Sequence, residues 1–277
     1  MRRSVQASVA LAAWLLLASV VLGALQTPGR AAGDDPALAD ITPHRAVYAL
    51  DLLHSRSSSG IIGSRGAAYF EWAKPCQGYL VNQHVRMQLA LSEGQSSVAV
   101  LIFSSLESVD GRNMSFKLRQ TVDGVVTEEL EGVAELDAAG GVAHFAGPDR
   151  KDVALPAGTM FPSTYTRRAL ATMIAGEALF AGFLFDGSTA DGAYHVTTFF
   201  GPPDNRPVPR GKPGEVEAFW PNRAGYFQAG SDDAEPLFEV GSMVNAGGVA
   251  EWFDLDYGSF AVRASLTEIE RLPEPRC

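Results

Sequence analysis

Cysteine and positive charge are both scarce in this chain. Cys76 and Cys277 are the only cysteines among 277 residues, and neither lies at the end of the N-terminal apolar run, which excludes a lipid-modified lipoprotein. Lysine and arginine number 22 against 32 acidic residues, so the formal net charge is −10. A chain this acidic repels phosphate backbones, and no nucleic acid is therefore expected as a partner.

Long hydrophobic runs are missing after the N-terminal segment. There, Arg2 and Arg3 precede an uncharged apolar run over residues 7–25, and the small-residue stretch 29–32 follows. This order is typical of a secretory signal, so residues 1–32 are predicted to be a signal peptide cleaved at about residue 24–32. The run is long enough to span a bilayer, and an uncleaved anchor is the alternative. We expect the mature chain in the periplasm, with no transmembrane domain after signal cleavage.

The isolated cysteine pair is interpreted as a disulfide. In an oxidising compartment, two cysteines without other partners favour a bond between them, and two free thiols are the alternative. A bond between Cys76 and Cys277 would close a loop of roughly 200 residues, worth about 5 kcal/mol in the chain-entropy model. It would bring the last residue beside an early strand, so both ends of the chain would meet in one domain.

The exported part is predicted to be a single all-β domain. Residues 33–42 lack periodicity and are expected to be a linker, followed by one domain over residues 43–277. Short β-type runs alternate with turn signals, and Asp123-Gly124 between two such runs is a strong hairpin signal. One amphipathic helix is expected over about residues 163–176. Five prolines between residues 201 and 214 predict an exposed loop outside the sheet.

Reactive side chains do not form catalytic or metal-binding motifs. The five histidines contain no HxH or HExxH pair, and the run 62–66 lacks the first glycine of a Gly-x-Ser-x-Gly elbow. Asp254 and Asp256 share one face of a predicted strand, which suits paired carboxylates but also an ordinary outer face. Residues 186–192 resemble a calcium loop without its closing glutamate. We predict no catalytic, cofactor-binding or metal-binding residues and no cofactor.

Aromatic residues are frequent in the predicted strands. Most are expected in the core, but on the concave side of an open barrel they could line a groove for an acyl chain or a hydrophobic peptide. The aromatic residues in question are Tyr69, Phe70, Trp72, Phe183, Phe185, Trp252 and Phe253.

A set of short motifs occurs in a fixed order along residues 43–277. They are Pro43-His44-Arg45-Ala46-x-Tyr48, Gly60-x-x-Gly63-x-Arg65-Gly66, Cys76-x-Gly78-Tyr79, Phe161-Pro162-Ser163-Thr164, Phe185-Asp186-Gly187-Ser188, Leu255-Asp256-Tyr257-Gly258 and the final Cys277. In this combination the chain resembles the EipB family of cell-envelope integrity proteins from alphaproteobacteria. The resemblance implies a periplasmic β-spiral, an open barrel of about 14 mostly antiparallel strands with one helix, stapled by a disulfide between Cys76 and Cys277. It brings no enzyme activity, catalytic residue or ligand.

Three functions follow from these observations. The leading hypothesis is a non-enzymatic periplasmic factor that supports envelope integrity and stress resistance, with other envelope proteins, a lipid or a hydrophobic peptide as partners. The second is a carrier that holds a lipid or lipoprotein acyl chain on the concave face of the barrel. The third is an envelope hydrolase.

Overall fold

Alternation of apolar and polar residues makes strands the dominant element of this protein. Along β5 (Asn113–Val122), Met114, Phe116 and Leu118 are at most 3% exposed, whereas the residues between them face solvent. Successive side chains of a strand point to opposite faces, so such a strand covers a core with one face and meets water with the other.

The computed structural model describes residues 38–92, 94–147, 150–209, 211–275 and 277. The expected signal peptide and the residues up to 37 lie outside this part. The elements are β1 (His44–Ser55), η1 (Ser57–Ser59), β2 (Ile61–Ala73), β3 (Gly78–Leu91), β4 (Ser96–Ser108), β5, β6 (Val125–Asp137), β7 (Gly140–Phe145), β8 (Lys151–Leu155), β9 (Thr159–Met160), α1 (Pro162–Ile174), β10 (Leu179–Leu184), β11 (Tyr194–Phe200), β12 (Asp204–Pro207), β13 (Val216–Gln228), β14 (Phe238–Asn245), β15 (Ala250–Asp256) and β16 (Phe260–Arg271).

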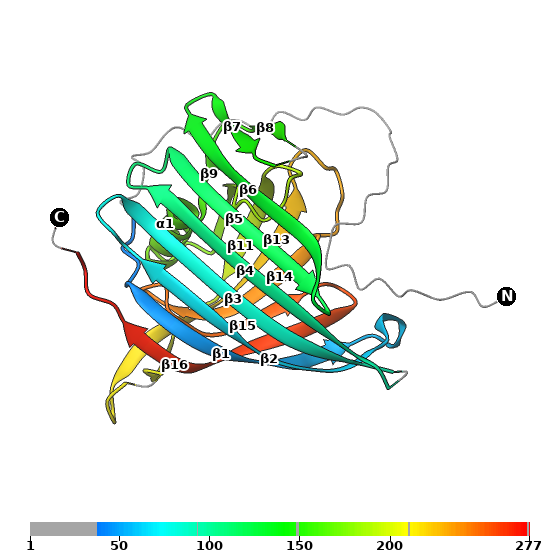
Figure 1. The fold of residues 1–277 in the computed structure, drawn as a ribbon. Helices are drawn as coiled ribbons and strands as arrows, with labels where there is room; N and C mark the ends of the chain where they lie inside the picture. Colours follow the sequence, from blue (N-terminus) through cyan, green and yellow to red (C-terminus); the bar gives the residue numbers. More distant parts are fainter. Residues whose placement is uncertain (1–37, 93, 148–149, 210, 276) are drawn as a thin grey trace. The chain divides into compact units, whose positions relative to one another are not determined.

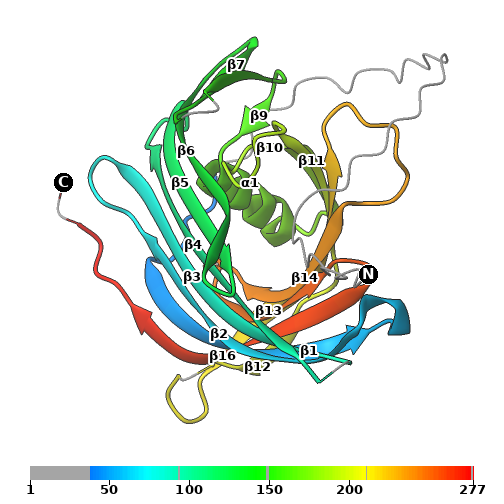
Figure 2. The same cartoon turned by 45° about the vertical axis from the view of Figure 1, so that its right-hand side comes forward.

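One sheet contains all of these strands. Its path runs β8-β7-β6-β5-β4-β3-β2-β1-β16-β15-β14-β13-β11-β10-β9, and β12 pairs only with β13. The pairing of β9 with β10 is parallel, and the others are antiparallel. The sheet curls into a nearly closed barrel (Figure 2). Its end strands, β8 and β9, are not paired with each other, so a seam remains between them, and residues 156–158 connect the two strands along the chain. The predicted open barrel is confirmed, with 16 strands instead of about 14.

Helix α1 lies inside the curve of the sheet (Figure 2). It covers Pro162–Ile174, close to the predicted range, with Phe161 as its N-cap residue and Pro162 in its first turn. Proline suits that position because its fixed φ matches the helix and its missing N–H has no partner there. The buried helix side chains, among them Tyr165, Leu170 and Met173, pack against the interior face of the sheet, which we define as the face turned toward α1.

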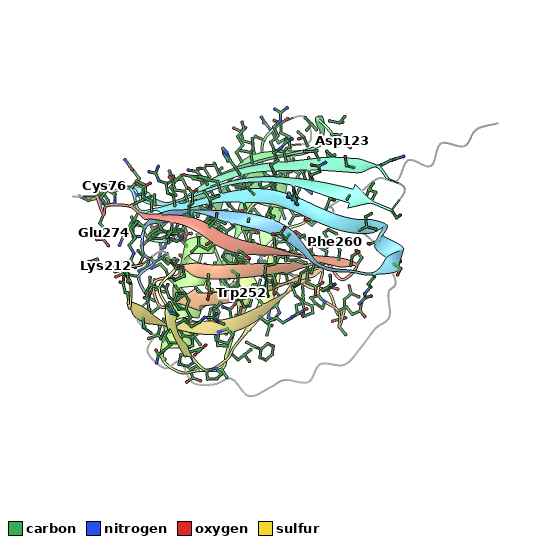
Figure 3. All side chains as sticks on the ribbon, turned by 90° about the horizontal axis from the view of Figure 1, so that it is seen from below. Cys76, Asp123, Lys212, Trp252, Phe260 and Glu274 are labelled. Carbon is green, nitrogen blue, oxygen red and sulfur yellow. A yellow bond between two sulfur atoms is a disulfide. The ribbon has the colours of Figure 1, made fainter. Side chains whose placement is uncertain are left out.

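The two ends of the barrel differ. At one end, which we call the tip end, the hairpins β1–β2, β3–β4 and β5–β6 turn, and in Figure 1 the first two of these turns project to the right. In Figure 3 the labelled Asp123 and Phe260 lie toward this end, and Cys76, Lys212 and Glu274 lie toward the other. The hairpin at Asp123-Gly124 is present as predicted, with positive φ at both residues.

Two sequence-based boundaries need correction. The proline-rich stretch was expected outside the sheet, yet β12 within it pairs with the start of β13. Because β12 is an edge strand, the lack of an N–H in its last residue, Pro207, is tolerated. The expected linker up to residue 42 also extends too far, since Ile41 is 6% exposed in the core and the Thr42 N–H donates to the carbonyl of Gly247 at 2.9 Å.

The Cys76–Cys277 disulfide joins the turn between β2 and β3 to the last residue. The two Cα atoms are 5.6 Å apart and the half-cystines are separated by 201 positions in sequence. Both half-cystines are exposed. The bond therefore fixes a C-terminal segment that otherwise runs past the end of β16 without strand pairing.

Candidate functional site

Glu107 links the sheet to the interior helix. It ends an interior-facing row of β4 and is 1% exposed. Its carboxylate accepts hydrogen bonds from the backbone N–H groups of Ser163 at 2.7 Å and Thr164 at 3.0 Å, and from the Thr164 hydroxyl. The first N–H groups of a helix have no partner within the helix, so this carboxylate caps α1 from a distant strand.

Burial raises the pKa of Glu107, while the hydrogen bonds from Thr164 and Ser163 act in the opposite direction. A buried carboxylate normally costs free energy unless donors satisfy it, and here two backbone donors and a hydroxyl do so. The N-cap residue itself, Phe161, has no side-chain acceptor. Glu107 is therefore a structural anchor for the helix, a role that was not predicted from the sequence.

A row of aromatic rings follows the interior face between β11 and β16. Tyr194 contacts Tyr226 edge-to-face at 5.7 Å between ring centroids, and Tyr226 stacks on Phe238 at 4.4 Å. The row continues to Tyr257 at 6.3 Å and from there to Phe260 at 5.2 Å. These five residues are called the interior aromatic row below. Burial raises the pKa of the Tyr226 and Tyr257 hydroxyls, which keeps both phenols protonated.

The aromatic residues singled out in the sequence divide between the two faces. Phe70 and Trp72 point inward, and the Trp72 indole N–H donates to the Ser163 hydroxyl at 3.2 Å. Trp252 instead lies under the guanidinium of Arg263 at 4.5 Å, on a strand position paired with the exposed Ser265. The set therefore does not form one continuous lining. The interior aromatic row, built from other residues, takes that place.

The histidines and Ser64 lie in separate environments. Ser64 faces inward, and its hydroxyl oxygen is buried without a hydrogen-bond partner. His84 is exposed and packs against Tyr69 at 6.1 Å, and His54 contacts the Asp256 carboxylate at 3.4 Å. His144 pairs with Asp152 on the outer face at 2.8 Å. Because Ser64 and His84 are on opposite faces, they do not form a nucleophile–base pair.

Asp254 and Asp256 do share the outer face, and each is held by a cation. Asp254 accepts two hydrogen bonds of 2.6 Å from Arg263, and Asp256 contacts Arg223 at 3.5 Å and His54 at 3.4 Å. Both carboxylates therefore belong to a surface ion-pair network. Their spacing in the sequence reflects the period of a strand.

Residues 185–192 form a packed turn beside the seam. Phe185 is fully buried and meets Phe116 at 5.5 Å, while Asp186 accepts a hydrogen bond from the Ser188 N–H at 2.9 Å. Gly187 has a φ of +75°, and a Cβ at this position would lie 2.4 Å from the Phe116 ring. The glycine is thus required by close packing. Among the described residues, no group of three or more His, Cys, Asp or Glu side chains is placed to hold a metal ion.

An open groove crosses the outer face of β4 to β7. It has a volume of about 790 Å³ and continues into a second hollow of about 330 Å³ through the shared residues Leu106, Ser115 and Val133. The Lys117–Glu131 ion pair at 2.6 Å lines its side.

The described residues include no helix long and apolar enough to cross a bilayer.

Comparisons with known proteins give consistent results. The profile of the family described as EipB-like matches residues 36–273. The "Cell envelope integrity protein EipB" of Brucella abortus strain 2308 is 27% identical over 237 residues, which cover 83% of this chain and 84% of the relative. A crystal structure of a "Beta-barrel-like Protein of Domain of Unknown Function DUF1849" from Brucella abortus superposes with a TM-score of 0.78 at 26% identity, covering 85% of this chain and all of that one.

Proposed function

The chain belongs to the EipB-like family, and from this premise we propose that it is a non-enzymatic periplasmic factor that supports cell-envelope integrity and resistance to envelope stress. The observation that carries the proposal is the match along nearly the whole folded unit to a family whose relative bears the name of an envelope integrity protein. The exposed Cys76–Cys277 disulfide supports export, because such bonds persist in oxidising compartments.

The non-enzymatic part of the proposal is supported by what the polar groups do. Glu107 caps a helix, Asp254 and Asp256 pair with arginines, and His144 pairs with Asp152 at the surface. Each of these groups already has a structural partner. A catalytic constellation would instead bring such groups together around a space for substrate.

Deletion of the gene tests the proposal. The deletion strain should become sensitive to detergents and β-lactams, and the wild-type gene should restore resistance. Fusion of alkaline phosphatase after Cys277 should give active phosphatase, which requires export. Full resistance of the deletion strain, in a cell without a second family member, would contradict the envelope role, and an inactive fusion would contradict the periplasmic location.

A carrier for an acyl chain or a hydrophobic peptide is the second candidate, and the interior aromatic row favours it. Tyr226, Phe238 and Tyr257 are only partly buried although they lie on the interior face. Aromatic rings in such a position offer a large apolar contact area to a ligand. Native mass spectrometry of protein isolated from the periplasm tests this: a carrier should retain a lipid or peptide that Tyr226→Ala releases, and a spectrum of bare chain would exclude it.

A further inference from the structure

Apolar side chains are exposed at the hairpin turns of the tip end. Ile62 is 65% exposed and Leu53 44%, both beside the β1–β2 turn, and Val125 is 67% and Val126 42% exposed at the β5–β6 turn. We call these four residues the apolar tips. A single exposed apolar residue is ordinary, but several together on one rim indicate a contact surface.

Irregular strand pairing keeps three of the four apolar tips, Ile62, Leu53 and Val126, out of the interior row. Ile61 pairs with Leu91 and Gly63 with Ala90, so Ile62 is an extra residue, and the interior position goes to Ile61, which is 6% exposed. Leu53 is likewise skipped between the pairs of Leu52 and His54 with β16. A bulge re-aims side chains and is a specific feature of a sheet.

The same kind of shift occurs at the β5–β6 turn. Glu128 pairs with Gln120 but Val126 pairs with Thr121, so one residue of β6 is skipped. Without the shift, period-two alternation from Glu128 would place Val126 on the interior face with Gln120. Instead, it lies opposite a residue of the outer row that includes Arg119.

The tips are held in place by hydrogen bonds. The Ser55 hydroxyl donates to the Ile61 carbonyl at 2.7 Å, and the Ser92 N–H donates to the Gly60 carbonyl at 2.8 Å, which joins the turn of β1–β2 to that of β3–β4. The β5–β6 turn is joined to the start of β4 by the Asp123 N–H, which donates to the Val98 carbonyl at 2.8 Å. The three turns therefore form one continuous rim.

Positive charge flanks the β1–β2 tip, although the chain as a whole is acidic. Arg56 and Arg65 are exposed, and within the described part of the chain neither of them forms an ion pair; we call them the flanking arginines. Asp51, opposite Arg65 in the register, is the nearest acidic partner in the strand pairing. Apolar side chains next to unpaired arginines complement a surface that is apolar below and negatively charged above.

We propose that the tip end docks on an anionic lipid surface, with the apolar tips in the boundary between headgroups and acyl chains and the flanking arginines on the lipid phosphates. The inference rests on the proposed envelope function and names the surface on which that function is exerted. The loop between β13 and β14 carries Asp232, Asp233 and Glu235, all exposed, at the same end of the strands. Repulsion from anionic headgroups orients this loop away from the lipid, so the rim formed by the β1–β2, β3–β4 and β5–β6 turns approaches first.

Flotation with vesicles tests the proposal on protein released from the periplasm by osmotic shock. The protein should float with vesicles of phosphatidylglycerol and phosphatidylethanolamine and remain below vesicles of phosphatidylcholine alone. Ile62→Ser together with Val125→Ser should weaken partitioning by roughly tenfold or more. Arg56→Gln should weaken it roughly fivefold at low salt. Val216→Ser is the matched control, because Val216 is 58% exposed at the opposite end of β13.

Unfolding midpoints of the tip variants equal to that of the parent protein will show that folding is unaffected. The proposal is overturned if the parent does not float with anionic vesicles, or if the tip variants and Val216→Ser float equally. Self-association of the parent protein through the tips, seen in light scattering without any vesicle binding, would also overturn it. If vesicle binding fails while the gene still complements the deletion strain, the lipid inference falls and the envelope function stands.

Discussion

The Glu107 carboxylate accepts a hydrogen bond of 2.7 Å from the backbone N–H of Ser163, which follows it by 56 positions in the sequence. One side chain at the end of β4 thereby sets the position at which the interior helix begins. Glu107→Ala should lower the free energy of unfolding by about 2–3 kcal/mol, because buried helix N–H groups lose their acceptor. Urea unfolding measures the change.

Glu131→Ala is the control for this variant, because Glu131 is an exposed carboxylate on the outer face of β6. Its removal should leave the unfolding midpoint almost unchanged. Equal stability of Glu107→Ala and the parent protein would show that the helix is held by packing alone.

Burial makes His44 a source of acid sensitivity. The side chain is 1% exposed, its Nδ1 lies 2.7 Å from the Thr42 carbonyl oxygen, and burial lowers its pKa below the ordinary 6.5. A lowered pKa in the folded state means that the unfolded chain takes up the proton first, so stability is present above about pH 6.5 and is lost as pH falls below it. The slope should approach about 1.4 kcal/mol per pH unit.

His44→Gln checks this linkage, since glutamine can still donate to the Thr42 carbonyl but does not titrate. The variant should be less stable than the parent at neutral pH, and the difference should shrink as the pH falls below 6.5. A difference independent of pH, measured by urea unfolding across this range, would contradict the assignment.

Gly187 and Gly230 separate backbone strain from packing. Both have positive φ, at +75° and +81°, but a Cβ on Gly187 would collide with Phe116, whereas nothing lies within 4 Å of one on Gly230. Gly230→Ala should therefore cost only the left-handed conformation, about 1–2 kcal/mol. Gly187→Ala should lower the free energy of unfolding by about 1–3 kcal/mol more than Gly230→Ala does, because the added methyl group overpacks the site. Equal thermal midpoints for the two variants would refute the packing role.

Much of this architecture was predictable because it depends on local patterns. Period-two alternation identifies strands such as β5, the Asp-Gly pair fixes the β5–β6 hairpin, and Pro162 marks the start of the helix. Two isolated cysteines behind a predicted secretory signal point to their disulfide. Each of these signals lies in a few consecutive residues or in a simple count.

Features that depend on distant contacts were not predictable in this way. Glycines such as Gly140 and Gly141 at the start of β7 carry no side chain, so the apolar–polar alternation that marks a strand is not visible there. The capping role of Glu107 requires α1 to lie beside the end of β4, which no local pattern encodes. A weak signal existed, since Glu107 continues the interior-facing row of Phe103 and Ser105, where a charged residue needs a buried partner.

The disulfide should be the largest single contribution to stability outside the core. Cys76→Ser opens a link across 201 positions and frees the C-terminal segment, so the free energy of unfolding should fall by about 2–5 kcal/mol. Cys277→Ser should have the same effect, and the double variant should be no less stable than either, since one bond is lost in all three. Reduction of the parent protein should match them, while thiol labelling of the unreduced, denatured parent should detect no free thiol. With the periplasmic location proposed above, the variants meet proteases there and should also complement the deletion strain poorly under detergent stress. Wild-type stability in Cys76→Ser would mean that the pairing of β16 with β1 fixes the C-terminal segment without the disulfide.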